Sequence, residues 1–163
     1  SPDFLKAPEP LIQKNFARIM SLKDGTKKMS KSDPSDLSRI NLTDGKDEIV
    51  NKIKKAKTDL LTLPSDDKNL SERPEVENLL GIYSNLSNQS LNNSINEFSG
   101  KNFSEFKEKL ADLVVEKITP ISNEINKLQK DNNFIDSVLS DGARKASVIA
   151  SKKVEEMKKI IGF

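Results

Sequence analysis

A short loop near the start of the sequence holds the side chains best suited to chemistry. Residues 23–32, here called the basic loop, carry four lysines and one aspartate, a local charge of +3, together with the hydroxyls of Ser30 and Ser32. A flexible lysine is a mobile point charge that can follow charge as it develops on a phosphate. The loop therefore suits a polyphosphate ligand. The alternative is a solvated basic turn, which is common for short lysine clusters. The four lysines are Lys23, Lys27, Lys28 and Lys31.

The segment before the basic loop indicates how the loop is positioned. Residues 16–22 are almost continuously apolar, which is typical of a short buried strand in a parallel sheet. Open α/β sheets bind ligands beyond the carboxyl ends of such strands, which is where the basic loop begins. Nothing downstream supplies partner strands, and a lone strand cannot satisfy its own backbone. We therefore expect residues 16–22 to complete a sheet encoded elsewhere.

After the basic loop, apolar residues recur every three or four positions, the period of helices. Asp44 is the expected N-cap of the first helix, whose apolar positions run from Ile49 to Leu60. Pro74 suits the first turn of a second helix, and Gly100 ends a short third one.

Two longer helical patterns occupy the C-terminal part of the sequence. One begins at Phe103 and keeps its phase past Pro120, so we favour one kinked helix over two helices. The other begins near Phe134 and continues beyond Gly142. The sequence thus predicts a mainly α fold, a helical bundle preceded by one strand and the basic loop.

The composition excludes several classes of protein. The 163 residues include no cysteine and no histidine, which removes disulfides, thiol catalysis, histidine acid–base chemistry and most zinc sites. The net charge is only +2, with +4 in residues 1–60 and −2 in residues 61–163, so a histone-like binder is excluded but a local basic site is not. No apolar stretch approaches the roughly 20 residues that span a bilayer. We expect a soluble, cytoplasmic protein without a membrane partner.

One motif identifies a family. Lys28-Met29-Ser30-Lys31-Ser32 matches, letter for letter, the second signature of class I aminoacyl-tRNA synthetases. The sequence that follows resembles the bacterial tryptophanyl-tRNA synthetase family more than its tyrosyl relatives, and the resemblance is clearest from Ala17 onward. The stretches that carry it are Asp33-Pro34, Ile40-Asn41-Leu42-Thr43-Asp44, Ala56-Lys57-Thr58-Asp59, Arg73-Pro74, Asn78-Leu79-Leu80, Ile82-Tyr83-Ser84 and Asp141-Gly142-Ala143.

The resemblance implies a reaction and residue roles. In this family tryptophan attacks the α-phosphate of ATP, giving tryptophanyl-adenylate and pyrophosphate, and the aminoacyl group then passes to tRNA(Trp). By that likeness, Lys28 and Lys31 face the phosphates, Ser30 and Ser32 order the loop, and Met29 anchors it. Two residues before the loop, Ile19 and Met20, match the place where the family holds adenine.

The resemblance also implies an organisation and partners. Residues 1–43 correspond to the end of a Rossmann-like catalytic domain, and residues 44–163 to a helical domain that meets the tRNA anticodon. The implied ligands are ATP, tryptophan and tRNA(Trp), with Mg²⁺ carried on the ATP phosphates and no protein ligand assigned to it. The family usually forms homodimers, mainly through the catalytic part.

The absence of histidine indicates which part of the family's protein this sequence corresponds to. The family's first signature contains histidines, and the tryptophan pocket lies in the same part of the protein, whereas this sequence has no histidine. We therefore expect a C-terminal portion that is inactive by itself. The alternatives are a standalone, non-catalytic RNA-binding helical module derived from a synthetase and a purely structural bundle.

Other polar and aromatic groups have simpler interpretations. For the lysines at 52, 54, 55 and 57 we favour a solvated face over RNA contact, whereas the two stay equally open for lysines 145, 152, 153, 158 and 159. Helix capping explains Asp44, Asp47 and Glu48 better than a metal site does. We expect Tyr83 to pack with its hydroxyl on a polar partner, and we expect four phenylalanines to be core residues: Phe98, Phe103, Phe106 and Phe134.

Overall fold

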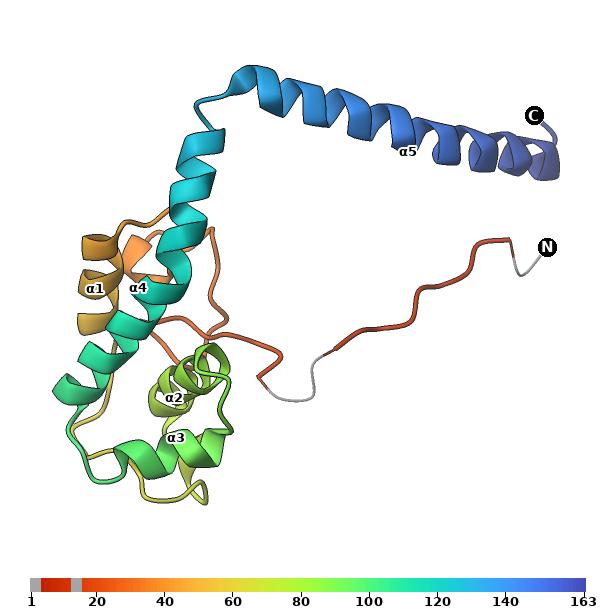
Figure 1. The fold of residues 1–163 in the computed structure, drawn as a ribbon. Coiled ribbons are helices and arrows are strands. Elements are labelled where there is room, and N and C mark those ends of the chain that lie inside the picture. The colour runs from red at the N-terminus through yellow and green to blue at the C-terminus, as the bar shows by residue number, and fades with distance from the viewer. Residues whose placement is uncertain (1–3, 13–15) are drawn as a thin grey trace. The chain divides into compact units, whose positions relative to one another are not determined.

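A computed structural model describes residues 4–12 and 16–163 of the chain. Its helices account for the mainly α fold that the periodicity predicts (Figure 1). The chain divides into two compact units, Ser1–Thr119 and Pro120–Phe163. The predicted domain boundary after residue 43 stays a prediction. The α-helices are α1 (Lys46–Lys54), α2 (Pro74–Leu86), α3 (Leu91–Phe98), α4 (Phe103–Leu128) and α5 (Asn132–Ile161), with short 3-10 helices η1 (Asp36–Ser38) and η2 (Leu70–Glu72).

The strand predicted over residues 16–22 is not formed. Within the described residues this segment makes one isolated antiparallel bridge, between Met20 and Lys28. Residues 17–19 are exposed, whereas Ser21 and Leu22 are buried. A parallel strand needs neighbours to pair with its backbone, and here loops pair with it instead: the Ser21 N–H donates to the Lys27 carbonyl at 2.8 Å.

The start of α1 differs from the prediction. Its N-cap is Gly45, whose N–H donates to the Glu48 carboxylate at 2.7 Å. Asp44 does not cap the helix, because its carboxylate accepts hydrogen bonds from Lys52 and Asn41. Glu48 lies in the first turn and takes part in capping, as the sequence analysis predicts. The helix ends at Lys54, before the predicted apolar position Leu60.

The other helix ends follow the sequence signals. Pro74 is the first residue of α2, as predicted. Gly100 follows α3 with a φ of 71°, a left-handed conformation that suits glycine and stops the helix. One continuous helix, α4, passes through Pro120, and α5 passes through Gly142.

The core of the first unit lies among α1, α2, α3 and α4. Phe98 and Phe106 are fully buried, with ring centroids 4.8 Å apart, and Tyr83 meets Phe98 edge-on at 4.8 Å. Phe103 packs, half-buried, against the same cluster. The prediction for Phe134 is wrong: its side chain is 48% exposed, because α5 contains no buried residue in the described structure.

Candidate functional site

A pocket of about 740 Å³ brings most of the predicted site residues together. The end of the basic loop lines one side, Ile19 and its two preceding residues line another, and residues 39–43 complete the lining. Met20 and Ser32, which the prediction also includes, are not in the lining. The predicted residues that the pocket does unite are Ile19, Lys28, Met29, Ser30 and Lys31.

Backbone pairing places the basic loop against the segment before it. The Met29 N–H donates to the Ile19 carbonyl at 3.0 Å, and Met20 bridges to Lys28. Met29 is partly buried and packs against the core, so its side chain fixes one end of the loop while its neighbours stay exposed. Lys28 and Lys31 therefore project from an anchored backbone.

The lysines of the basic loop differ in their partners. Lys27 forms an ion pair with Asp24 at 3.2 Å. The Thr26 hydroxyl and N–H also donate to Asp24, and these hydrogen bonds, with that of Lys27, lower the pKa of its carboxyl group to about 2. Lys28 and Lys31 form no ion pair with any described residue. Two lysine charges at the pocket are thus available to an anionic ligand.

The two serines form a local turn. Their hydroxyl oxygens lie 2.9 Å apart, and the Ser32 N–H donates to the Ser30 hydroxyl at 3.3 Å. Because these bonds close a short loop on both sides of Lys31, they restrict the backbone that carries its ammonium group.

A side chain on α2 holds the Met20 backbone. The Met20 N–H donates to Asn78 Oδ1 at 2.9 Å, and Asn78 Nδ2 donates to the Met20 carbonyl at 2.8 Å. Asn78 is only 2% exposed. The N–H of Met20 is therefore used by the protein itself, whereas the neighbouring Ile19 lines the pocket.

Two arginines that were not among the predicted site residues also line the pocket. Arg18 is exposed and has no ion-pair partner among the described residues. Arg39 is largely buried and donates to the Asp33 carbonyl at 3.0 Å and to Asn41 Oδ1 at 3.2 Å, and it pairs with Asp36 at 2.9 Å. Both lie outside the basic loop, so a local charge count could not find them.

The solvated face predicted for lysines 52, 54, 55 and 57 is wrong for Lys52. Its side chain is 3% exposed, and its ammonium nitrogen lies 2.6 Å from Asp44 and 2.7 Å from Asp36. Burial opposes the charged form, but hydrogen bonds to both aspartates outweigh burial and raise the pKa of Lys52. Lys54 and Lys55 are exposed, as predicted, and Lys57 pairs with Glu75 at 2.7 Å.

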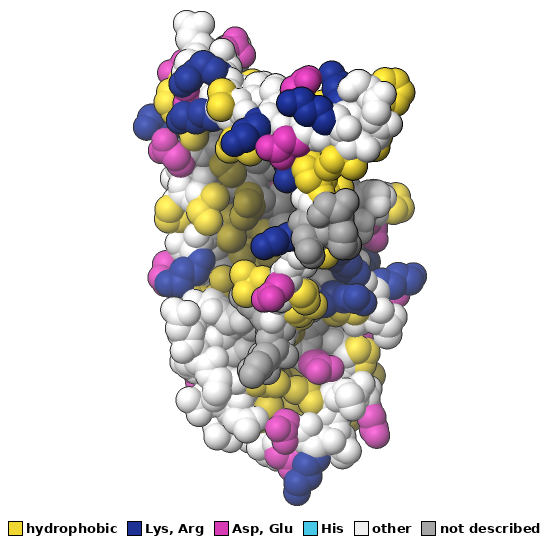
Figure 2. All heavy atoms as spheres, turned by 90° about the vertical axis from the view of Figure 1, so that its right-hand side faces the viewer, with side chains coloured by type: hydrophobic (Ala, Val, Ile, Leu, Met, Phe, Trp, Pro, Cys, Tyr) yellow, Lys and Arg dark blue, Asp and Glu magenta, His cyan; other side chains and the backbone are white. Residues whose placement is uncertain are grey.

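Charged side chains of both signs are scattered over the face of the protein in Figure 2. Figure 2 shows Lys and Arg side chains interspersed with Asp and Glu side chains on the face it presents. In the described part of the chain, no three His, Cys, Asp or Glu side chains cluster as metal ligands do, and no helix has the length and apolarity to cross a membrane.

Comparison with known proteins gives one consistent result. The family model described as tRNA synthetases class I (W and Y) matches residues 2–120. Tryptophan–tRNA ligase of Mesorhizobium japonicum is 52% identical over 160 residues, which is 98% of this chain and 45% of that protein. The Agrobacterium fabrum ligase is 54% identical over 155 residues, 95% of this chain and 44% of that protein. The chain thus spans less than half the length of these relatives.

Solved structures give the same fold. Tryptophanyl-tRNA synthetase from Mycoplasma pneumoniae superposes with a TM-score of 0.74 at 27% identity, over 93% of this chain and 45% of that one. The Campylobacter jejuni synthetase, complexed with ADP and tryptophan, superposes with a TM-score of 0.68 at 22% identity, over 99% of this chain and 48% of that one.

Proposed function

The chain belongs to the class I tRNA synthetases for tryptophan and tyrosine, and from that membership we propose that it is the C-terminal portion of a tryptophan–tRNA ligase. The full protein would activate tryptophan with ATP and attach it to tRNA(Trp). The observation that carries the proposal is the pocket in which Lys28 and Lys31 lie with no ion-pair partner among the described residues. The identity of about half to several tryptophan–tRNA ligases supports tryptophan over tyrosine.

In this proposal the basic loop stabilises the leaving pyrophosphate. Negative charge grows on the β- and γ-phosphates as tryptophan attacks the α-phosphate, and the ammonium groups of Lys28 and Lys31 balance it. Both side chains are exposed, and the long aliphatic stem of a lysine lets its ammonium group follow the phosphates as the bond breaks. The hydrogen-bonded hydroxyls of Ser30 and Ser32 order the turn around Lys31.

The other side of the pocket would hold the nucleoside. Ile19 and Met29 line it and offer an apolar surface to adenine. Met20 supports this contact indirectly, because Asn78 already binds its backbone. ATP is therefore oriented with its base near Ile19 and its phosphates near the lysines.

The pocket suits a metal that arrives with its nucleotide. The residues that line it supply cationic, hydroxyl, amide and apolar groups but no carboxylate. Mg²⁺ prefers oxygen ligands and is often held mainly by substrate phosphates. We assign it no ligand from this chain.

The remaining partners follow from the family. The helical residues 44–163 would contact tRNA(Trp) near its anticodon, with the lysines of α5 as candidate phosphate contacts. Tryptophan would bind in the part of the ligase to which this chain does not correspond. A homodimer in the cytoplasm is the expected working form.

The test uses the full-length protein that contains this sequence. Tryptophan-dependent exchange of pyrophosphate into ATP should fall about 10²- to 10³-fold in kcat on Lys31→Ala, the loss typical of one group that stabilises developing charge. The matched control is Lys27→Ala, which removes a lysine of the same loop that pairs with Asp24 and does not line the pocket; it should change kcat less than about two-fold.

Two results would overturn the proposal. One is an equal loss of exchange in both variants, which would mean that the lysines act only through overall charge. The other is tryptophan-dependent exchange by the 163-residue chain alone, which would show that the chain is a complete enzyme and not a portion of one.

A further inference from the structure

Lys52 is the most deeply buried charged side chain near the pocket. It lies on α1, three residues after Ile49 and next to Ile53, so the helical period turns it toward the core. The side chain is 3% exposed, yet its ammonium group meets two carboxylates. Taking such a group out of water is unfavourable, and here the hydrogen bonds to two aspartates outweigh that penalty. Because well-packed apolar residues of similar volume often stabilise a protein as much as a buried ion pair does, stability alone is a weak explanation for a lysine here.

The two carboxylates connect Lys52 to the residues that follow the basic loop. Asp36, on η1, pairs with Lys52 at 2.7 Å and with Arg39 at 2.9 Å. Arg39 in turn donates to the carbonyls of Asp33 at 3.0 Å and Ser35 at 3.5 Å. Asp33 follows Ser32 directly. The ammonium group is thus linked, through two ion pairs and the hydrogen bonds of Arg39, to the residues that directly follow the basic loop.

The same ammonium group also holds the opposite side of the pocket. Asp44 binds Lys52 at 2.6 Å and accepts the Asn41 N–H at 2.8 Å. Asn41 Nδ2 donates to both Asp44 and Asp36, at 3.1 and 3.2 Å. Asn41 itself lines the pocket, within the stretch 39–43. One buried ammonium group therefore connects residues 39–43, which line the pocket, with residues 33–36, which follow the basic loop.

We propose that Lys52 is a positioning residue for ATP binding: it holds residues 33–36 and residues 39–43 at the separation that the triphosphate needs. It acts through Asp36 and Asp44 and does not touch the nucleotide. This inference rests on the proposed function, since ATP is the ligand that the pocket would bind.

The first measurement needs no ligand. Hydrogen exchange of the 163-residue chain should show the Asn41 N–H, and amides of residues 33–44 in general, exchanging at least ten-fold faster in Lys52→Met, while amides in the middle of α2 keep their rates. Lys52→Arg, which keeps the charge, should restore slow exchange. The matched control is Lys57→Met, which breaks the more exposed pair with Glu75 and should leave residues 33–44 unchanged.

The second measurement is the ATP affinity, by calorimetry at low salt, of the full-length protein that contains this sequence. We expect a dissociation constant at least ten-fold larger in Lys52→Met and less than two-fold larger in Lys57→Met. If Lys52→Met fails to fold because the buried Asp44 carboxylate loses its ammonium partner, the double variant Lys52→Met with Asp44→Asn removes that charge and takes its place.

The outcomes separate the two proposals. Unchanged exchange over residues 33–44, or uniformly faster exchange along the whole chain, would overturn the positioning role. Equal ATP affinity of a folded Lys52→Met and the unmodified protein would also overturn it. Failure of the full-length protein to bind ATP would count against the proposed function instead, and hydrogen exchange would still decide whether Lys52 holds residues 33–44.

Discussion

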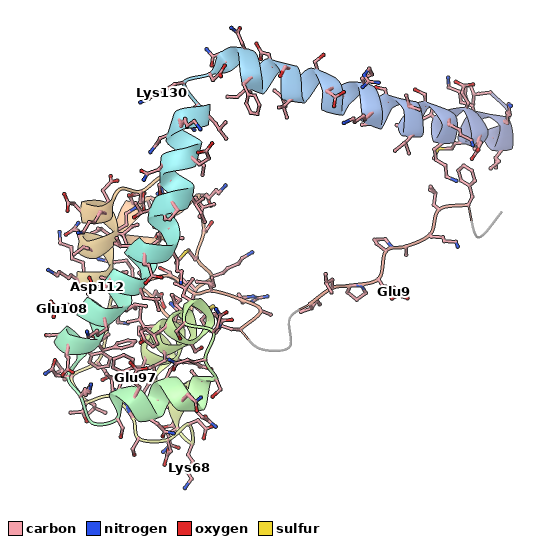
Figure 3. The ribbon with its side chains drawn as sticks, viewed as in Figure 1. Glu9, Lys68, Glu97, Glu108, Asp112 and Lys130 are labelled. Atoms are coloured by element: carbon pink, nitrogen blue, oxygen red, sulfur yellow. The ribbon has the colours of Figure 1, made fainter. Side chains whose placement is uncertain are left out.

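Tyr83 provides a probe of the core at the scale of one residue. It lies on α2, and its hydroxyl donates to Glu97 on α3 at 3.0 Å (Figure 3 labels Glu97). Burial, and then the hydrogen bond and charge of Glu97, raise the pKa of Tyr83 to about 12. The chain has one tyrosine and no tryptophan, so tyrosinate absorbance reports this residue alone.

The prediction is a titration midpoint near 12 in the folded chain, against the ordinary 10.0 in urea. Glu97→Gln should lower the midpoint without returning it to 10.0, because burial persists. Since the folded pKa is raised, its contribution to stability is complete below pH 10 and is lost as pH rises toward 12. Circular dichroism at each pH verifies that the chain is folded, and a midpoint near 10 in the folded chain would contradict the packing of Tyr83.

Single residues also show which site features a sequence can reveal. The letters from Lys28 to Ser32 match the second signature of class I synthetases, because the chemistry of the loop is local, and the stretches that follow them extend the resemblance to the tryptophanyl family. The partners of Lys52 could not be found in this way. The sequence predicted a solvated face for Lys52, because no local signal shows that Asp36, on η1, reaches its ammonium group through tertiary packing.

At the scale of elements, we predict that replacing glycine by alanine has opposite effects on stability at two positions. An added Cβ would meet nothing within 4 Å at Gly142 or at Gly100, but Gly100 has a φ of 71° and Gly142 lies within α5. Gly142→Ala should stabilise α5 by about 1 kcal/mol through helix propensity. Gly100→Ala should destabilise the first unit by about 1 kcal/mol, because alanine is strained in the left-handed region.

Hydrogen exchange in α5 measures the effect of Gly142→Ala. Urea unfolding followed by Tyr83 fluorescence measures the effect of Gly100→Ala. A stabilising Gly100→Ala would show that α3 does not end as described. A destabilising Gly142→Ala would indicate that the face of α5 at Gly142 is covered in solution.

The elements that sequence predicted well are those that local signals determine. Pro74 begins α2, and the phase of apolar residues carried α4 through Pro120. Residues 16–22 form no strand because strand formation depends on neighbouring strands, which the described residues do not supply; their place in a sheet encoded elsewhere stays a prediction. The prediction that Phe134 is a core residue is wrong for a similar reason, since periodicity shows which face of a helix is apolar but not what covers it.

At the scale of the whole chain, we predict that stability is lost in acid, because carboxylates that pair with basic side chains become protonated. Hydrogen bonds from Arg73 lower the pKa of Asp59 below 3.8, and a hydrogen bond from Lys57 lowers the pKa of Glu75 below 4.5. Depressed carboxyl pKa values give stability that is present above the ordinary values and lost as pH falls through the lowered ones. The free energy of unfolding should therefore decrease steadily below about pH 4.5.

Urea unfolding at a series of pH values tests this expectation. Asp59→Asn should flatten part of the decrease, because one of the titrating groups is gone. Asp66→Asn is the matched control, since no charged residue among those described pairs with Asp66. An unchanged slope in Asp59→Asn would show that the pair with Arg73 does not form in solution.

The most direct test of the central claim is to titrate ATP into the 163-residue chain and follow its backbone amides by NMR. We predict saturable shifts concentrated at residues 17–19 and 28–31, weaker binding at higher salt, and loss of the shifts in Lys31→Ala but not in Lys27→Ala. Shifts scattered over the surface, or equal binding by Lys31→Ala and the unmodified chain, would contradict the assignment of this pocket to ATP.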